Sequence, residues 1–366
     1  MIPLSPPNPP NAAALREVRY EYSNNFVPLL AQLGASLLVS TYQAGKLIAV
    51  GVHNQTLQLS FHNFERAMGL AIGPNQIAVG GSNCIYFLKN TPDIAPRIDP
   101  VGTYDACFTI RGAQYTNDIA VHEMAWGQKE LLLTNTRFSC LSTLHNRFNF
   151  LPQWRPDFIS ALVPEDRCHL NGVALHHGKA KYVSVFGLTD TAGGWRDRKA
   201  THGCVIEVDT GNVVARGLSM PHSPRFVNGR LWVLNSGRGE MASVDLSSGR
   251  IEPLLSLPGY PRGLAIAGQF AFVGLSKVRE KETFGNLPIS AHADGFQCGV
   301  AIIDLKNAQQ IGCLSFHSGV EEIFDVQLLP GVRNPYIAGP YATVDGTPPI
   351  WLLPQQPSRI LTKGNV

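Results

Sequence analysis

Short apolar runs recur along the chain, and each begins just after a polar or charged residue. The clearest copies are Arg66–Ile72 (RAMGLAI), Asn117–Val121 (NDIAV), Asn171–Leu175 (NGVAL), Pro224–Gly229 (PRFVNG) and Arg262–Ile266 (RGLAI). Self-similarity of this kind is typical of architectures that use one supersecondary unit several times. The repeat therefore predicts the architecture, although it does not name a ligand.

Between these copies the pattern is that of β-strands almost throughout. Runs of β-prone residues bounded by Gly or Asn are Ser36–Thr41, Lys46–Gly51, Thr56–Phe61, Gln76–Gly80 and Cys84–Leu88. One segment, Phe26–Leu33, has a length and a leucine spacing that fit a short helix about as well as a strand. The expected fold class is all-β.

Two later copies show the repeating unit in full, as four strands in order. These are Asn171–Leu175, Tyr182–Phe186, Gly203–Asp209 and Val213–Gly217, and then Arg225–Val227, Arg230–Leu234, Met241–Asp245 and Ile251–Leu257. Tight polar turns at Asp209–Gly211 and Asp245–Gly249 join the third strand to the fourth. Four antiparallel strands per repeat make one blade of a β-propeller.

The number of repeats predicts the number of blades. Units that start near Phe26, Arg66, Asn117, Asn171, Arg225, Arg262 and Glu322 favour seven. Six blades are the alternative, if Phe26–Leu33 is a helix and the two chain ends share a blade. With seven, the last unit holds only Phe324–Leu329, Tyr336–Gly339 and Ile350–Leu353, and an N-terminal strand at Val18–Tyr22 supplies the fourth and closes the ring.

Composition fits one globular domain. The chain has 366 residues, of which 44% are hydrophobic and 16% are charged. Large all-β assemblies commonly use this many residues as a single unit. We expect a mobile Pro-rich tail over residues 1–17, the propeller over residues 18–355 and a C-terminal tail over residues 356–366.

Charge and cysteine content exclude several classes of protein. A formal net charge of +3, with both signs interspersed, argues against a dedicated nucleic-acid binder. No apolar run approaches the roughly 18 to 20 residues of a membrane span, and the first residues do not resemble a signal peptide. The seven cysteines form no CxxC pair and fit buried thiols in a reducing compartment. We expect a cytoplasmic protein that binds neither nucleic acid nor a membrane.

The propeller geometry predicts where a site lies. All innermost strands run the same way along the central channel, so the residues just before them meet at one mouth. They are Arg66, Asn117, Asp118, His169, Asn171, His222, Arg225, Arg262, Glu321, Glu322 and Asp325. Asn and Asp are also ordinary turn formers. The three arginines are not, and they repel one another unless an anion or carboxylates balance them, so we assign Arg66, Arg225 and Arg262 to substrate binding.

Two long polar loops belong to the same mouth, because the loop between the second and third strands lies where the inner strand begins. They are Leu188–His202 and Lys277–Gln297. Loops of this length are commonly functional lids or disordered insertions. A lid that covers a ligand has a use for aromatic side chains, so we expect Trp195, His202 and His292 to bind the substrate.

The same mouth carries candidate metal ligands and acid–base groups. Asp118, Asn171 and Glu322 offer the oxygen ligands that suit Ca²⁺, Mg²⁺ or Mn²⁺, and participation of His169 and His222 would favour Zn²⁺. Asp118, His169, His222 and Glu322 are the candidate catalytic residues. No HxH or HExxH spacing fixes two metal ligands locally.

Several further runs carry a family resemblance. Ser40–Lys46, Phe64–Gly69, Thr116–Ile119, His169–Val173, Ser223–Arg225 and Asp325–Gly331 resemble an uncharacterised bacterial β-propeller family, a conserved hypothetical domain of unknown function. The resemblance runs from about Ala35 to Gly339. The chain is more distantly similar to the regucalcin and gluconolactonase superfamily, and Asn171–Ala174 resembles the metal-ligand strand of that group. This second resemblance implies six blades and one divalent cation bound through Glu, Asn and Asp, but the three arginines are not part of that pattern.

Two functions follow from these residues. One is a metal-dependent enzyme, hydrolase-like (lactonase-like) or an isomerase, that acts on an anionic or polar substrate under the two loops. The other is a non-catalytic propeller that binds a small molecule or a peptide, or takes part in a protein interaction. A propeller supports either equally well.

Overall fold

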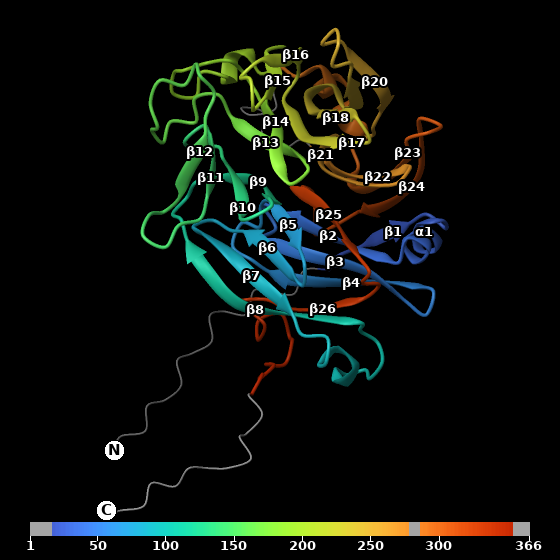
Figure 1. Cartoon of the computed structure of the whole chain (residues 1–366). Coiled ribbons are helices and arrows are strands. Elements are labelled where there is room, and N and C mark those ends of the chain that lie inside the picture. Colours follow the sequence, from blue (N-terminus) through green and yellow to red (C-terminus); the bar gives the residue numbers. More distant parts are fainter. Residues whose placement is uncertain (1–16, 278–285, 354–366) are drawn as a thin grey trace, which may run out of the picture.

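The chain forms a ring of six β-sheets around a central channel (Figure 1). This computed structural model describes residues 17–277 and 286–353, with the side chains of residues 292–294 left out. The predicted all-β propeller of four-stranded antiparallel blades is confirmed, and the preferred count of seven blades is not, because the described residues form six. Apart from Glu17, both predicted tails lie outside the described residues.

We number the blades along the chain and give their strands from the channel outwards. Blade 1 contains β25 (Asp325–Pro330), β2 (Ala35–Thr41), β3 (Lys46–His53) and β4 (Thr56–Asn63). Blade 2 contains β5 (Leu70–Gly73), β6 (Gln76–Gly80), β7 (Cys84–Asn90) and β8 (Ala106–Tyr115). Blade 3 contains β9 (Val121–Trp126), β10 (Leu131–Asn135), β11 (Cys140–Thr143) and β12 (Leu151–Trp154).

The second half of the ring repeats this order. Blade 4 contains β13 (Leu170–His176), β14 (Lys179–Val185), β15 (Gly203–Glu207) and β16 (Val213–Leu218). Blade 5 contains β17 (Pro221–Val227), β18 (Arg230–Asn235), β19 (Glu240–Val244) and β20 (Ile251–Ser256). Blade 6 contains β21 (Tyr260–Ala267), β22 (Phe270–Ser276), β23 (Cys298–Asp304) and β24 (Gln309–Phe316). Short 3-10 turns are η1 (Ala95–Arg97), η2 (Arg196–Arg198), η3 (Ser236–Arg238) and η4 (Pro288–Gly295).

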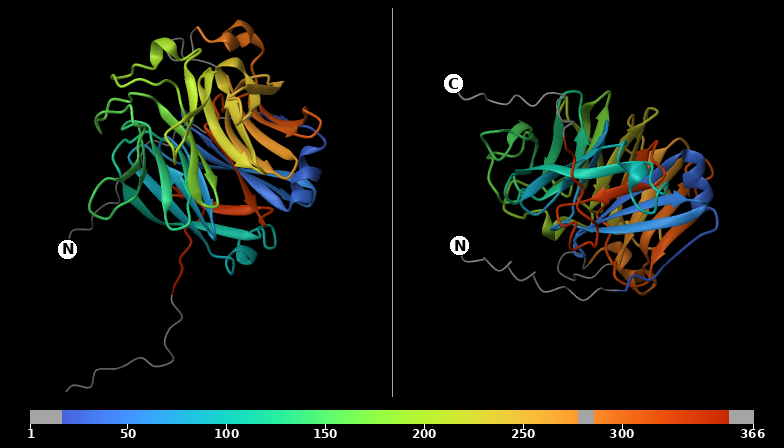
Figure 2. Two further views of the ribbon diagram at one scale, coloured as in Figure 1. Left: turned by 45° about the horizontal axis from the view of Figure 1, so that its top comes forward. Right: turned by 90° about the horizontal axis from the view of Figure 1, so that it is seen from below.

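The two ends of the chain share blade 1, as the six-bladed alternative required. Its innermost strand, β25, pairs antiparallel with β2. In Figure 2 the red strand from the C-terminal part of the chain lies beside the blue strands of this blade. Phe26–Leu33 is the helix α1, and it ends at Gly34, whose left-handed conformation lets its N–H reach the last carbonyls of the helix. The described residues therefore contain no seventh blade.

The strands expected to complete a last blade have other partners. The N-terminal strand β1 (Tyr20–Tyr22) joins the outer edge of blade 6 by pairing with β24. The strand β26 (Pro335–Ala338) lies parallel to β8 on the outer edge of blade 2. Residues 350–353 form no strand. The N-terminal strand thus links the two chain ends, but it protects an outer edge while β25 closes the ring.

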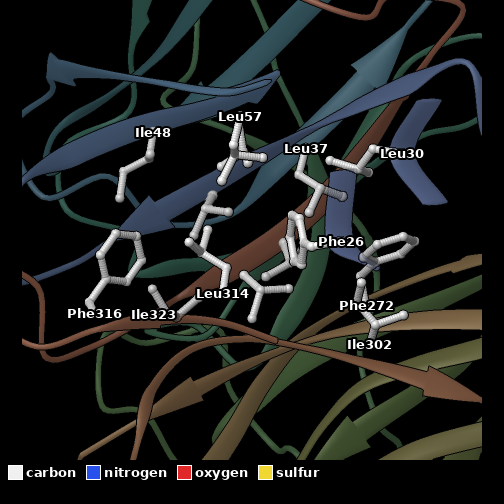
Figure 3. Packing of buried hydrophobic residues seen from close by; sticks show 14 of the residues in the cluster. Phe26, Leu30, Leu37, Ile48, Leu57, Phe272, Ile302, Leu314, Phe316 and Ile323 are labelled. Carbon is white, nitrogen blue, oxygen red and sulfur yellow. The ribbon is translucent and has the colours of Figure 1, made fainter. Parts of the chain in front are cut away.

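An apolar cluster joins blade 1 to blade 6 and to the helix (Figure 3). Phe26 and Leu30 of α1 pack with side chains from β2, β3, β22, β23 and β24, among them Phe272 and Phe316, and all four are almost fully buried. Burial of a side chain of this size contributes about 1.5–3 kcal/mol. The apolar residues of Phe26–Leu33 therefore form one face of a helix, and this face packs where blade 1 meets blade 6.

The innermost strands contact one another in sequence all around the ring. Buried hydroxyl groups fasten them, because a Ser or Thr at or just after the end of a second strand donates to a carbonyl oxygen of the next blade. The bonds run from Ser40 to Met68, from Thr136 to Leu170, from Ser236 to Pro261 and from Ser276 to Ile323, at 2.5–3.1 Å. Each bond links one blade to the residues that begin the next inner strand.

Blades 6 and 1 approach each other closely at Gly263 on β21. A Cβ atom there would lie 2.5 Å from the backbone nitrogen of Val326 on β25, and the residue has a φ of +79°. Gly217 has nearly the same φ, +82°, with nothing within 4 Å of a Cβ atom. Substitution of Gly217 therefore measures the cost of the backbone conformation alone, whereas substitution of Gly263 adds the cost of the contact with β25.

We predict that Gly263→Ala destabilises the protein far more than Gly217→Ala. The second change should cost about 1–2 kcal/mol, the usual cost of a left-handed conformation with a side chain. The first should cost at least about 3 kcal/mol more, because blades 6 and 1 must move apart. Denaturant unfolding of both variants measures the difference, and equal losses of stability would show that ring closure tolerates a methyl group at this contact.

Candidate functional site

A cavity of about 250 Å³ opens at the end of the channel where the innermost strands begin. All six blades contribute to its wall. The lining side chains are Tyr42, Gln43, Arg66, Met68, Asp118, Ala120, His122, Arg137, His169, Phe186, Trp195, Met220, His222, Tyr260, Arg262, Ser276, Lys277, Glu322 and Phe324. The wall combines cationic, imidazole and aromatic groups.

Seven of the residues proposed from the sequence line this cavity. They are Arg66, Asp118, His169, Trp195, His222, Arg262 and Glu322. Asn171 and Arg225 lie outside its wall, and His202 is an exposed loop residue beside Thr201. His292 belongs to η4, and its side chain is not among those described.

Both predicted lid loops reach the cavity. Trp195, from the loop after β14, is buried with Leu287 and Ile289 from the loop after β22. Its indole N–H donates to a carboxylate oxygen of Asp166 at 3.1 Å. The two loops are therefore packed against each other at the rim, although residues 278–285 of the second lie outside the described part.

Cationic side chains outnumber carboxylates in the wall. Asp118 pairs with Arg137 and, at 3.9 Å, with Arg66. Glu322 lies 3.6 Å from Arg262. Lys277 is a fourth cation, so the wall has four permanent positive charges and two negative ones.

Arg262 is the most deeply placed of these cations. Its guanidinium lies over the ring of Phe324, 3.4 Å from the centroid, and its side chain is about one-tenth exposed. Burial lowers the pKa of Arg262, while the charge of Glu322 favours the protonated form. A guanidinium retains its proton under such conditions, so Arg262 is a fixed positive charge at the floor of the cavity.

Two imidazoles in the wall have the same surroundings on different blades. His122 of β9 has its Nδ1 atom 2.9 Å from the carbonyl oxygen of Ala120, and His222 of β17 has its Nδ1 atom 3.0 Å from that of Met220. Burial, with the charge of Arg262, lowers the pKa of both rings well below the ordinary value of 6.5. Both imidazoles are therefore neutral at pH 7.

The third imidazole has a carboxylate partner instead. The Nδ1 atom of His169 lies 2.9 Å from Asp166, and its ring stacks on Phe186 and lies against Trp195. His169 and Asp166 both have a positive φ, of 51° and 47°. An imidazole oriented by a carboxylate at Nδ1 presents Nε2 to the cavity, which is the arrangement of a general base.

A smaller cavity of about 10 Å³ lies beneath the first, enough for roughly one water molecule. Asn171 lines it, and its Oδ1 atom accepts a hydrogen bond from Ser184, whereas its buried Nδ2 group has no hydrogen-bond partner. Glu123 and Asp325 line only the smaller cavity, whereas His122, His222, Arg262 and Phe324 line both cavities.

Arg225 contacts one of the carboxylates at the smaller cavity. Its guanidinium pairs with Glu123, and its Nε group donates to the carbonyl oxygen of Leu264 at 2.8 Å. Glu123 also accepts the backbone N–H of Val173 at 2.8 Å. Arg225 therefore joins blades 3, 5 and 6, and this structural pairing accounts for its charge.

The three predicted metal ligands do not come together. Asp118 and Glu322 are each paired with arginine at the cavity, while Asn171 lies at the smaller cavity below. Among the described residues, no group of three His, Cys, Asp or Glu side chains is placed to hold an ion. These side chains do not fit the predicted centre in this arrangement, and we derive no chemical step through a metal.

Sequence reasoning missed several residues of the wall, notably His122, Arg137, Tyr42 and Phe324. One signal was present for His122. An Asn followed by a hydroxyl residue occurs at Asn135–Thr136 and again at Asn235–Ser236, and each hydroxyl lies 14 residues after the histidine whose Nδ1 it contacts. The remaining residues come from turns that carry no such pattern.

The comparisons with known proteins give a family and a fold. The family described as "Domain of unknown function (DUF4915)" matches residues 24–338. No curated protein matches the chain. A solved structure titled "Crystal structure of Nidogen/Laminin Complex" is similar with a TM-score of 0.51 and 13% sequence identity, and the match covers 81% of this chain and 99% of that one. A likeness at this identity supports the propeller fold alone.

The buried carboxyl groups of Glu123 and Asp325 should make the stability of the protein depend on pH. Burial raises the pKa of Glu123 from 4.5 to about 7, and burial raises that of Asp325 as well. Between these two pH values the folded protein binds more protons than the unfolded chain. Its free energy of unfolding therefore falls as the pH rises from about 4.5 to 7, and levels off above that.

We predict that Glu123→Gln reduces this fall. From pH 5 to pH 8, the free energy of unfolding of Glu123→Gln should fall by roughly 2 kcal/mol less than that of the unchanged protein. The part of the fall that is due to Asp325 should remain. Denaturant titrations at the two pH values measure it. Glu252→Gln, which changes an exposed carboxylate beside Arg250, should leave the fall unaltered, and an unaltered fall in Glu123→Gln would contradict the assignment.

Proposed function

The chain belongs to this family of unknown function, and from the geometry of its cavity we propose that it binds a small anionic molecule at the mouth of the channel. The observation that carries the proposal is the excess of cations over carboxylates in a wall that also contains several aromatic and imidazole rings. Such a wall is electrostatically unbalanced until an anion enters, because like charges in a partly enclosed site repel one another. A carboxylate or phosphate group satisfies guanidinium donors in paired hydrogen bonds.

The shape of the cavity supports a small ligand. Its volume of about 250 Å³ is close to the lower end of the usual range of roughly 300–1,000 Å³ for ligand sites. Aromatic side chains from several elements, among them Tyr42, Trp195 and Tyr260, line the wall and offer apolar faces for the uncharged part of a ligand. A peptide would have to enter by one short acidic side chain or by its terminal carboxylate.

The predicted relation to the regucalcin and gluconolactonase superfamily remains part of this proposal. Six blades support it, and so does the position of Asn171 on the inner strand of blade 4. A bound divalent cation (Ca²⁺, Mg²⁺, Mn²⁺ or Zn²⁺) is the further element that this relation would require. A cation site would need the carboxylates of Asp118 and Glu322 to leave their arginine partners.

We also propose a reducing, cytoplasmic location. All seven cysteines fall in the described part of the chain, and each of them is free of disulfide bonds. Six are buried, as expected for thiols used as small apolar residues. None of the helices in residues 17–277 and 286–353 has the length and apolar character that crossing a membrane requires.

A second candidate function is hydrolysis of the bound anion, and the pairing of His169 with Asp166 favours it. The Nε2 atom of His169 would take a proton from a water molecule, whose oxygen then bonds to the carbonyl carbon of an ester or lactone. The bond from that carbon to the leaving oxygen breaks, and the leaving oxygen receives the proton from His169. Asp166 holds the imidazole in the tautomer that this step needs.

We predict that anions stabilise the protein through this cavity. Succinate, citrate and phosphate at matched ionic strength should raise the melting temperature in a saturable manner. The variant Arg66→Gln should weaken binding about tenfold in calorimetric titration, because it removes one charge-assisted contact of roughly 1.5 kcal/mol. Arg216→Gln, which removes an exposed arginine on β16, is the control. Equal stabilisation of all three proteins would place the anion elsewhere.

We predict for the second candidate that His169→Gln lowers kcat/KM by about 10²–10⁴-fold, the usual contribution of a general base. The substrates to test are esters and lactones that also carry a free carboxylate. Hydrolysis is measured from the base needed to hold the pH constant. His177→Gln, at an exposed turn of the same blade, should retain full activity. A protein that binds these compounds and turns none of them over would contradict the enzyme and leave the binding proposal standing.

A further inference from the structure

His122 and His222 have equivalent environments on blades 3 and 5. In each case the Nδ1 atom approaches the backbone carbonyl oxygen two residues earlier, at 2.9 and 3.0 Å. In each case it also approaches a hydroxyl at the end of the neighbouring strand, Thr136 at 2.9 Å or Ser236 at 3.0 Å. The repetition shows that the surroundings of these rings are set by the blade and not by chance packing.

The neighbours of each ring determine where its proton lies. A backbone carbonyl oxygen can only accept a hydrogen bond. The hydroxyl hydrogens of Thr136 and Ser236 are already donated to the carbonyl oxygens of Leu170 and Pro261, at 2.6 and 2.7 Å. Both partners of Nδ1 therefore act as acceptors, and Nδ1 must carry the hydrogen in both rings.

The remaining nitrogen, Nε2, then carries a lone pair in the neutral ring. Both rings line the ligand-sized cavity, and burial keeps the pKa of both well below the usual 6.5. At neutral pH these two imidazoles can accept a hydrogen bond at Nε2 but cannot donate one. The wall thus has acceptors from blades 3 and 5 as well as the guanidinium donors of Arg66, Arg137 and Arg262.

We propose that the ligand of this cavity is an anion that also carries hydrogen-bond donors, hydroxyl or ammonium groups, which it presents to the Nε2 atoms of His122 and His222. This inference rests on the proposed function, because it describes the same cavity. A simple carboxylate would satisfy the guanidinium groups and leave the two Nε2 lone pairs without a partner. A hydroxylated or aminated carboxylate satisfies both sets of groups at once.

The same lone pairs could in principle bind a metal ion. The third imidazole does not support that, because His169 is tied at Nδ1 to Asp166 and the described side chains include no trio placed around a common point. The positive charge of Arg262 contributes to the lowered pKa of both rings and disfavours a second cation beside them. A neutral donor, or an ammonium balanced by its own carboxylate, fits this position better.

The test compares dicarboxylates of one chain length that differ in their hydrogen-bond donors and, for aspartate, also in net charge. Succinate has none, malate has one hydroxyl, tartrate has two, and aspartate has an ammonium group where malate has its hydroxyl. Calorimetric titration of the full-length protein at pH 7.5, in EDTA to exclude metal bridging, gives four dissociation constants. We expect binding to tighten about 3- to 10-fold with each hydroxyl, since a net hydrogen bond contributes in that range. Malate against aspartate identifies the kind of donor.

The variant His222→Phe keeps an aromatic ring of similar size and removes Nε2. We expect it to lose most of the preference for tartrate over succinate. His177→Phe, at an exposed turn, is the matched control and should keep that preference. Because succinate serves as the internal reference, a variant that merely folds poorly is recognised by its loss of succinate binding.

A measurement without any variant keeps the inference testable if His222→Phe fails to fold. In ¹⁵N spectra of histidine-labelled protein at pH 7.5, the imidazoles of His122 and His222 should have an unprotonated Nε2, and their signals should shift when tartrate is added but not when succinate is added. Equal affinity for succinate and tartrate would overturn the inference and leave the proposed function intact. If none of the four anions binds, the proposed anion site fails and the inference fails with it.

Discussion

Glu123, Arg225 and Asp325 are charged side chains that lie where the innermost strands of the ring meet. Glu123 of blade 3 accepts the N–H of Val173 in blade 4 and pairs with Arg225 of blade 5, which in turn donates to the carbonyl oxygen of Leu264 in blade 6. Asp325 of blade 1 accepts the N–H of Leu70 in blade 2 at 2.9 Å. Buried charges cost several kcal/mol each unless they are paired. The full set of these contacts therefore forms only when all six blades are in place, which favours cooperative closure of the ring.

The contacts between neighbouring blades also fix the orientation of side chains in the candidate site. The hydroxyl groups that fasten blade 3 to blade 4 and blade 5 to blade 6 are the same ones that hold His122 and His222. An imidazole on an inner strand is thus oriented by the contact between its blade and the next. Groups held in this way need little reorganisation when a ligand arrives, which favours binding. The structural role and the proposed ligand-binding role thus fall to neighbouring atoms of the same strands.

Much of the architecture could be predicted from the repeat, because four short strands with tight turns have few other solutions. The blade count was wrong for a local reason. Phe26–Leu33 has apolar residues that suit either period, and only its packing over the ring closure makes it a helix. The run at Tyr336 was correctly expected to be a strand, but its parallel partner, β8, is more than two hundred residues away, and local pattern does not specify a partner so distant.

The site could be located but not assigned side chain by side chain. Residues before the inner strands do meet at one mouth, so Arg66, Asp118, Arg262 and Glu322 line the cavity. Arg225 does not, because β17 begins at Pro221, four residues before Arg225, and the guanidinium pairs with Glu123 outside the cavity wall. His122 was missed for the opposite reason, since β9 begins at Val121 and not within the preceding polar run. A shift of a few residues along a strand moves a side chain from the mouth to the floor.

The shared blade has a consequence for how the protein is made. Strands β2, β3 and β4 leave the ribosome early, whereas their inner partner β25 is synthesised nearly three hundred residues later. Until then one edge of β2 lacks the strand that covers it, and such edges are sites of association between chains. The residues just before β25, Glu322 and Phe324, complete the floor of the cavity. Protection of the first blade and completion of the cavity wall thus depend on the same late event in translation.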